Sequence, residues 1–348
     1  MIDFRYHLVS IVAVFLALAI GIVLGATNLR GGTLDLLQTT NDSLKNQLTA
    51  AEAARDGYLN QSSAAEQYLQ SAEPTLLARQ LAGENLVIVT EPGAQGSVVD
   101  GVRQAATLAG ATVTGEVALQ PKFNDISGAN QSSLSSINNS IVSQDGATLP
   151  AGSNPQTTYQ QQAAHLIASA ILASTTTAVT PADAQQILSA YAQGGYLTVS
   201  PAGAPTALAE LAVIVTPESA PGDGQNDPAN QVLLAVAQEF AGASSATLVA
   251  GSALGSAQSG SAMSVLRSSS VSSQVSSVDD ADLTLGQITA VDALAGQLAG
   301  KKPNSYGISG ASAVNPSPLP TPTSTATSTP TQTATPHSTT TRKAGAKK

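Results

Sequence analysis

The chain has 348 residues, a formal net charge of −9 and no cysteine. The lack of cysteine excludes disulfides, zinc–thiolate centres and thiol catalysis, and the acidic balance argues against a nucleic-acid partner, which requires a basic surface. Hydrophobic residues make up 42% of the chain but aromatic residues only 3%, so a packed core must be built mainly from Ala, Val, Leu and Ile.

An uncharged apolar stretch occupies residues 8–26 at the N-terminus. Nineteen helical residues extend roughly 28 Å, close to the hydrocarbon thickness of a bilayer, so the stretch predicts a single membrane-spanning helix within an anchor of residues 1–30. A cleaved signal peptide is the alternative, because the small residues Gly25 and Ala26 follow a short charged start. The apolar centre of such a signal is usually shorter, about 7 to 15 residues, which favours an uncleaved anchor.

A heptad pattern follows the anchor and predicts a coiled-coil stalk over residues 31–73. The positions spaced alternately four and three residues apart are Leu37, Asn41, Leu44, Leu48, Ala51, Arg55, Tyr58, Ser62, Ala65 and Leu69. We expect a homo-oligomer formed through this seam. The alternative is a single amphipathic helix that packs on its own domain, because Arg55 and Ser62 interrupt the apolar seam. Pro74 is expected to end the element.

The pattern then changes to that of an α/β domain, which we place at residues 84–313. The continuous β-branched run at 86–90 predicts a buried strand, and a helix at 98–109 and a strand at 112–119 complete a strand, helix, strand unit. Residues 120–154 are rich in Ser, Asn and Gly and are expected to form a mobile surface excursion.

The rest of the domain continues the alternation. Helices are predicted at 157–173, 181–192 and 228–240, the last with Asp227 as N-cap and Pro228 as first helical residue, and strands at 196–200, 211–216 and 246–250. This alternation predicts a Rossmann-like domain with a mostly parallel sheet. A final helix is expected to open at a capping box formed by Thr284 and Gln287 and to end near Gly300.

The C-terminal residues 314–348 form a Pro-, Ser- and Thr-rich tail that cannot bury enough apolar surface to fold, so we expect it to be disordered. Such tracts resemble O-glycosylated stalks or extended linkers, which are more usual outside the cytoplasm. The composition therefore places the body outside the cytoplasm, with the N-terminus on the cytoplasmic side.

Two segments are candidates for ligand or metal binding. The loop EPGAQG at residues 91–96 lies between a strand and a helix, where a phosphate could meet backbone N–H groups, but it lacks both GxGxxG and a Walker lysine, and a simple turn is the main alternative. Asp279, Asp280 and Asp282 could offer oxygen ligands to a divalent cation. They show no calcium-loop spacing, and acids ahead of a helix also stabilise its N-terminus.

No catalytic residue is proposed, and we expect that the protein is not an enzyme. A Ser-His-Asp device requires a positioned histidine, and the histidines are His7 beside the membrane, His165 in a predicted helix and His337 in the tail. None lies near a GxSxG nucleophile elbow. His165 is expected to be partly buried or at the rim of the domain.

Two blocks of sequence resemble the actinobacterial copper transport family MctB. The first is MIDFRYHLVSIVAVFLALAIGIVLG at the N-terminus, and the second is SSVDDADLTLGQITAVDALAGQLAGK with the following SYG. The positions that match the second family motif are Val278, Asp279, Gly286, Leu294, Gly300, Tyr306 and Gly307. The resemblance covers roughly residues 1–313 and implies a cell-envelope protein involved in copper efflux or homeostasis.

The residues themselves do not show copper chemistry. Cu(I) prefers thiolate and thioether ligands and Cu(II) prefers imidazole, whereas this chain offers only Met1, Met263 and three scattered histidines. We therefore expect no resident cofactor, with copper as the transported ion only. The alternative function is a membrane-tethered scaffold that recruits or regulates enzymes of cell-wall and septal remodelling.

Overall fold

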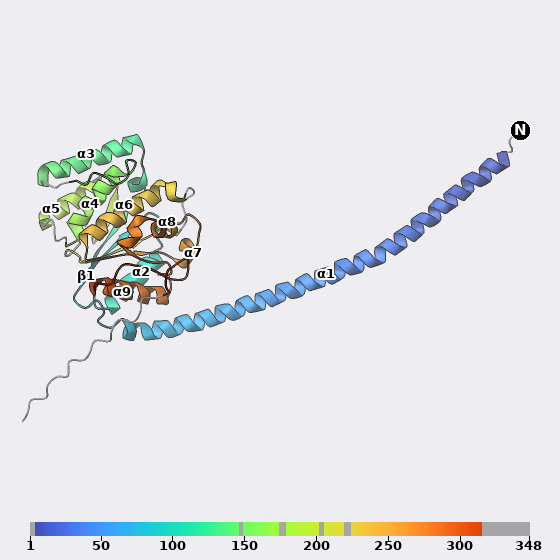
Figure 1. Ribbon diagram of the computed structural model, residues 1–348, viewed down its shortest axis with the longest axis horizontal. Helices are drawn as coiled ribbons and strands as arrows, with labels where there is room; N and C mark the ends of the chain where they lie inside the picture. The colour runs from blue at the N-terminus through green and yellow to red at the C-terminus, as the bar shows by residue number, and fades with distance from the viewer. Residues whose placement is uncertain (1–3, 146–148, 174–178, 202–204, 219–223, 315–348) are drawn as a thin grey trace, which may run out of the picture.

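The computed structural model describes residues 4–145, 149–173, 179–201, 205–218 and 224–314. They form a long N-terminal helix, α1 (Phe4–Leu77), followed by an α/β body. Helix α1 extends far from the body and touches it only near its C-terminal end (Figure 1). Residues 315–348 of the predicted tail lie outside the described residues.

Helix α1 contains 74 residues without a break, so the anchor and the stalk are one continuous helix. Its segment Tyr6–Ala26 is long and apolar enough to cross a membrane, and no other helix in the described ranges meets that test. The prediction that Pro74 ends the helix is wrong, since the helix continues to Leu77. Proline removes only one backbone hydrogen bond in this last turn, and Leu77 and Leu81 are buried in the body.

The sheet has seven strands in the order β3-β2-β1-β4-β5-β6-β7. Strand β3 is antiparallel to β2 and every other pair is parallel, which confirms a mostly parallel sheet. The strands are β1 (Asn85–Thr90), β2 (Thr112–Leu119), β3 (Leu197–Ser200), β4 (Leu211–Val215), β5 (Ala246–Ala250), β6 (Ser276–Val278) and β7 (Ser305–Tyr306).

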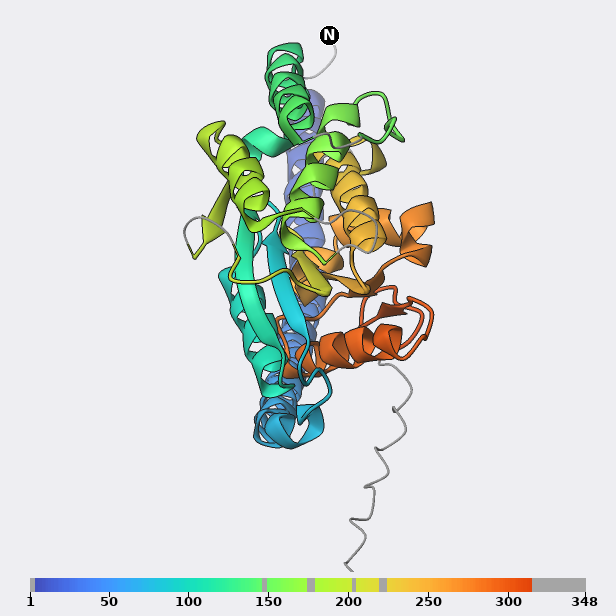
Figure 2. The same ribbon diagram turned by 90° about the vertical axis from the view of Figure 1, so that its left-hand side faces the viewer.

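Helices cover both faces of the sheet (Figure 2). One face carries α2 (Gly96–Leu108), α9 (Thr284–Leu298) and the C-terminal end of α1. The other face carries α4 (Thr158–Ile171), α5 (Pro181–Gln193), α6 (Pro228–Ala243) and α8 (Ala262–Ser268), with α3 (Gly128–Asp145) packed outside α4 and α5. The short helices are η1 (Pro121–Asn124), η2 (Gly224–Asn226), α7 (Ala253–Ser256) and η3 (Ser270–Ser273).

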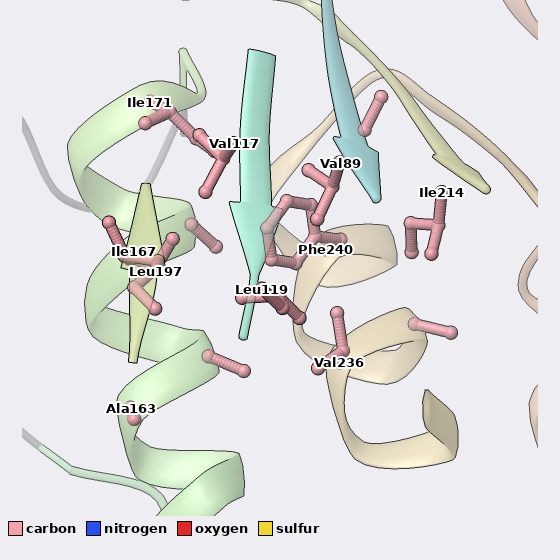
Figure 3. Packing of buried hydrophobic residues seen from close by; sticks show 14 of the residues in the cluster. Val89, Val117, Leu119, Ala163, Ile167, Ile171, Leu197, Ile214, Val236 and Phe240 are labelled. Atoms are coloured by element: carbon pink, nitrogen blue, oxygen red, sulfur yellow. The ribbon is translucent and has the colours of Figure 1, made fainter. Parts of the chain in front are cut away.

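The core between the sheet and helices α4 and α6 is built mainly from aliphatic side chains, and Figure 3 shows part of it. Its labelled members are Val89, Val117, Leu119, Ala163, Ile167, Ile171, Leu197, Ile214, Val236 and Phe240. All of them are buried, so this part of the core is covered by side chains of the same chain.

The described part of residues 120–154, expected to be a surface excursion without periodicity, instead contains η1 and the 18-residue helix α3. Its buried positions Leu134, Asn138 and Ile141 are three and four residues apart and so share one helix face. The side chain of Asn138 donates to the carbonyl of Tyr159 (3.0 Å) and accepts from the hydroxyl of Tyr191 (2.7 Å). Serine and asparagine, which have weak helix propensity, hid this pattern in the sequence.

Candidate functional site

The loop after β1 is a tight turn. The amide of Ala94 donates to the carbonyl of Glu91 at 3.0 Å, with Pro92 and Gly93 between them. Gly93 has φ +89°, the left-handed conformation that a type II turn requires at its third residue. Gly93 therefore serves a turn.

The same loop lies where a ligand of an open α/β sheet commonly binds. The chain leaves β1 toward β2 on one side and returns to β4 on the other, so the carboxyl ends of β1 and β4 form the topological switch point. Here the two loops are joined across that point, since the amide of Glu218 donates to the carbonyl of Gly93 (3.3 Å) and Ala94 forms a β-bridge with Pro217. These contacts occupy the crevice that a dinucleotide would use.

Glu91 places a carboxyl group beside the N-terminus of α2. Its side chain is 3% exposed, its Oε1 has no hydrogen-bond partner, and its Oε2 accepts only a long contact of 3.5 Å from Asn124. Burial raises the pKa of Glu91 to about 7. A phosphate at this helix end would meet this carboxyl group, so the geometry disfavours the phosphate site considered from the sequence.

A cavity of about 380 Å³ opens beside this loop, between α2 and β2. The charged and amide side chains around it are Glu91, Asp100, Arg103, Glu116 and Gln120. The guanidinium of Arg103 bridges two of the acids, because it donates to Asp100 from Nη1 and to Glu116 from Nη2 at 2.6 Å. Sequence reasoning missed this cluster, since its members lie on a helix and on a neighbouring strand.

Asp279, the first of the three candidate aspartates, forms a buried ion pair with Arg267 of α8, Oδ2 to Nη1 at 2.6 Å. Its carboxylate also accepts from the amides of Ile308 (2.7 Å) and Ser309 (3.0 Å). Gly307 has φ +122°, and a Cβ on it would lie 2.1 Å from Oδ1 of Asp279. Asp279 and Gly307 therefore form one structural unit that holds the chain after β7.

Asp280 and Asp282 have different surroundings. Asp282 accepts from the amide of Ala253 at 2.8 Å and so caps α7. Asp280 is 1% exposed and neither carboxyl oxygen has a partner. Burial, followed by the charges of Asp279 and Asp282, raises its pKa to about 6. A Cβ on Gly286 would lie 2.0 Å from the carbonyl oxygen of Asp280, which explains the glycine at that motif position.

The three aspartates thus have separate surroundings. Within the described ranges, no group of three or more His, Cys, Asp or Glu side chains is arranged to hold a metal ion. Met263 is buried in the body, His7 lies in α1, and Met1 and His337 lie outside the described residues. Metal binding by the three aspartates stays a prediction.

His165 lies at the rim of the body, as predicted, with 38% of its side chain exposed. Its Nδ1 is 2.9 Å from Oε2 of Glu239, and Gln161 donates to the other carboxylate oxygen at 2.7 Å. This arrangement links α4 to α6 and involves no nucleophile.

The stalk is coupled to the body through Glu66. Its Oε1 accepts from both the amide (2.9 Å) and the hydroxyl (2.5 Å) of Thr284, the first residue of α9. The predicted capping box is wrong, because the N-cap residue is Leu283, which has no capping side chain, and Thr284 is already inside the helix. A carboxylate from α1 instead satisfies the first turn of α9. Nearby Glu73 is 4% exposed, and its pKa is raised by burial and by the charge of Glu66.

An apolar N-terminal helix long enough to cross a membrane, joined to an α/β body, is the arrangement expected of a membrane-anchored protein with a globular head. The comparison with known families identifies the protein family to which the chain belongs. Residues 1–316 match the model of the family described as "Copper transport outer membrane protein, MctB". The chain belongs to the MctB family, which confirms the resemblance seen in its sequence.

Curated relatives match the sequence of this chain over almost their whole length. The protein named copper transporter MctB from Mycobacterium tuberculosis (strain H37Rv) is 31% identical over 325 residues, which cover 91% of this chain and 100% of the relative. The protein of the same name from Mycobacterium leprae is 30% identical over 321 residues, which cover 90% and 99%. The family match over residues 1–316 spans both the long helix α1 and the α/β body.

Proposed function

We propose that the protein acts in copper transport or copper homeostasis at the cell envelope, as a membrane-anchored protein whose body lies outside the cytoplasm. The observation that carries this proposal is the family match over residues 1–316, together with relatives named copper transporters. Copper is the cargo, and no catalytic step is assigned to the body.

The single span limits how this role is performed. The side chains between residues 8 and 26 are apolar except for Ser10. One such helix offers no polar lumen, which a water-filled pore requires. A transport role for this chain therefore depends on assembly with further copies or with an envelope partner.

The stalk is the segment we propose for that assembly, as a coiled coil formed with a second copy. Leu37, Leu44, Leu48 and Tyr58 are 65%, 59%, 60% and 72% exposed although they share the heptad seam. Leucine at such positions is normally covered by a facing helix. From Glu66 onward the helix contacts its own body instead, so the alternative of self-packing is supported only for its last turns.

The body is proposed to be Rossmann-like and extracytoplasmic. The strand order and the helices on both faces support the first description, although β3 runs antiparallel. The Pro-, Ser- and Thr-rich composition of residues 314–348 supports the second.

A tethered scaffold for cell-wall or septal enzymes is the second candidate function. The exposed seam of the stalk favours it, because that surface could equally hold a partner helix. The two functions differ in phenotype, since a scaffold predicts normal copper tolerance and defective division.

A complemented deletion strain tests the proposal. We expect deletion to raise cellular copper and copper sensitivity, and the wild-type gene to restore both. A seam variant, Leu44→Asp with Leu48→Asp, should fail to restore them, whereas Asn46→Asp with Gln47→Asp adds the same charge beside the seam and should succeed. Normal copper content in the deletion strain, with misplaced septa, would contradict the copper role and support the scaffold.

A further inference from the structure

The face of α1 that carries the heptad seam is also the face that packs on the body. Residues that are about 18 positions apart lie on the same side of an α-helix, because they are separated by about five full turns. Glu66, which accepts from Thr284, follows the seam position Leu48 at this spacing. Glu73, which is 4% exposed, follows the seam position Arg55 at the same spacing. The seam and the body contacts therefore form one continuous stripe along α1.

Helix α9 covers the last part of this stripe. It begins at Thr284, beside Glu66, and the side chain of Asp292 in its middle is hydrogen-bonded with Gln80 of the chain just after α1. Leu69 belongs to both sets, since it is a seam position and is packed against the core of the body. From Glu66 onward, α9 thus takes the place on α1 that a facing stalk helix would take before it.

This arrangement limits how far two stalks can pair. Each copy carries its apolar span at the N-terminal end of the stalk, so two stalks anchored in one membrane run parallel. Paired helices lie about 8 to 10 Å apart, which leaves no space between them for a third helix. A partner helix that covers the seam from Leu37 to Ser62 therefore meets α9 at Glu66, and the pairing must end there.

Exposed apolar side chains lie at the end of α9 that the partner helix would meet. Leu283, the N-cap residue of α9, is 37% exposed. The next residue back, Asp282, accepts from the amide of Ala253 at 2.8 Å and so holds α7 beside this end of α9. Leu254 of α7 is 74% exposed. Helix α7 lies on the side of the body toward which the N-terminal part of α1 extends (Figure 1).

We infer that Leu254 and Leu283 of one copy pack on the stalk of a second copy near Leu59 and Ser62, and that the coiled coil ends at this contact. Leu59 is itself 59% exposed and so offers an apolar partner. The inference rests on the stalk pairing proposed above and adds where that pairing stops and what covers its end. Each body then acts as a stop that fixes the register of the two stalks.

Cysteine cross-linking of the full chain tests where the pairing ends, since the chain has no cysteine of its own. Single-cysteine variants in detergent micelles are oxidised with diamide, and covalent dimers are counted on a non-reducing gel. We expect dimers of Leu44→Cys and Ser62→Cys. Leu76 is 49% exposed and would lie in a seam continued beyond Leu69, yet Leu76→Cys should give at least tenfold fewer dimers. Equal yields for Leu44→Cys and Leu76→Cys would overturn the inference.

Mixed pairs test the contact itself. Two differently tagged copies are co-expressed, one with Ser62→Cys and the other with Leu283→Cys, and we expect disulfide-linked dimers that carry both tags. The matched control replaces Leu283→Cys by Leu298→Cys, because Leu298 lies at the other end of α9 and is also 37% exposed. The control should give at least tenfold fewer mixed dimers. Equal yields from the two pairs would overturn the inference.

Failure of the stalk pairing has a different signature. Absence of covalent dimers of Leu44→Cys would contradict the pairing proposed for the stalk and the inference with it. Dimers of Leu44→Cys, without mixed Ser62→Cys and Leu283→Cys dimers above the control, would overturn the inference alone.

Discussion

The body and the stalk contain the same kinds of apolar residue, but the exposed fraction of these residues differs between the two regions. Leu86, Leu211 and Leu248 of the sheet are 0% exposed, whereas Leu44 and Leu48 of the stalk are 59% and 60% exposed. The body buries its apolar side chains within one chain, while the stalk leaves its seam uncovered. The comparison indicates that the core of the body is covered within one chain and that the apolar seam of the stalk is not.

The largest expected loss of stability comes from breaking the buried ion pair between Arg267 and Asp279 of the body. Arg267→Ala leaves the carboxylate of Asp279 buried without its cation. Loss of one partner from a buried pair destabilises by about 3 to 5 kcal/mol. Urea unfolding followed by the near-ultraviolet circular dichroism of the tyrosines measures this change.

The control for this buried ion pair is an exposed ion pair in the stalk. Arg55→Ala removes an exposed ion pair with Asp56, which is expected to contribute at most about 1 kcal/mol. Equal losses for Arg267→Ala and Arg55→Ala would show that the buried pair has no special role in the body.

A smaller effect is expected from the pH dependence that Glu91 adds to the body. Its pKa is about 7 in the folded state against 4.5 as the ordinary value, so the folded protein binds more protons between these pH values. The contribution of Glu91 to stability is therefore full below about pH 4.5 and decreases as the pH rises to about 7.

Replacement by glutamine removes this titration. We expect Glu91→Gln to be more stable than the wild type by about 1 to 3 kcal/mol above pH 7, with a flatter dependence of the free energy of unfolding on pH between 4.5 and 7. Denaturant titrations at pH 5, 6, 7 and 8 measure both. Parallel curves for the two proteins would contradict a raised pKa at Glu91.

Breaking the contact between the stalk and α9 should lower the stability of the first turn of α9 by about 1 kcal/mol. Glu66→Ala removes the stalk carboxylate that accepts from Thr284, and loss of a helix cap costs about 0.5 to 2 kcal/mol. Faster amide exchange in the first turn of α9, with Glu52→Ala unchanged, is the expected result. Unchanged exchange in Glu66→Ala would show that α1 does not cap α9.

The smallest effect on the body should come from the seam. Leu44→Asp with Leu48→Asp changes side chains that touch nothing in the body, so its unfolding free energy should change by less than about 0.5 kcal/mol. The same urea titration measures it. A larger loss would mean that the body depends on the state of the stalk.

The buried strands could be predicted because their sequences are continuous runs of β-branched and aliphatic residues. The N-cap of α6 could also be predicted, since Asp227 precedes Pro228 and its side chain accepts from the amide of Ala229 as expected. Strands β6 and β7 were missed, because three and two residues are too few to show any periodicity.

The site was less predictable than the fold, because its contacts join distant parts of the chain. The aspartates after β6 were visible in the sequence, but no spacing rule connects Asp279 to Arg267 and to the loop after β7. Glu66 and Thr284 are 218 positions apart. The cavity acids could be named only after α2 and β2 were seen to face each other.

The most direct test of the comparison is the molar mass of the full chain in detergent micelles, measured by light scattering with the detergent contribution subtracted. The account predicts at least two copies per particle for the wild type and one copy for Leu44→Asp with Leu48→Asp, with the body folded in both. A single copy for the wild type would contradict it, because the exposed seam of the stalk would then have no second copy to cover it.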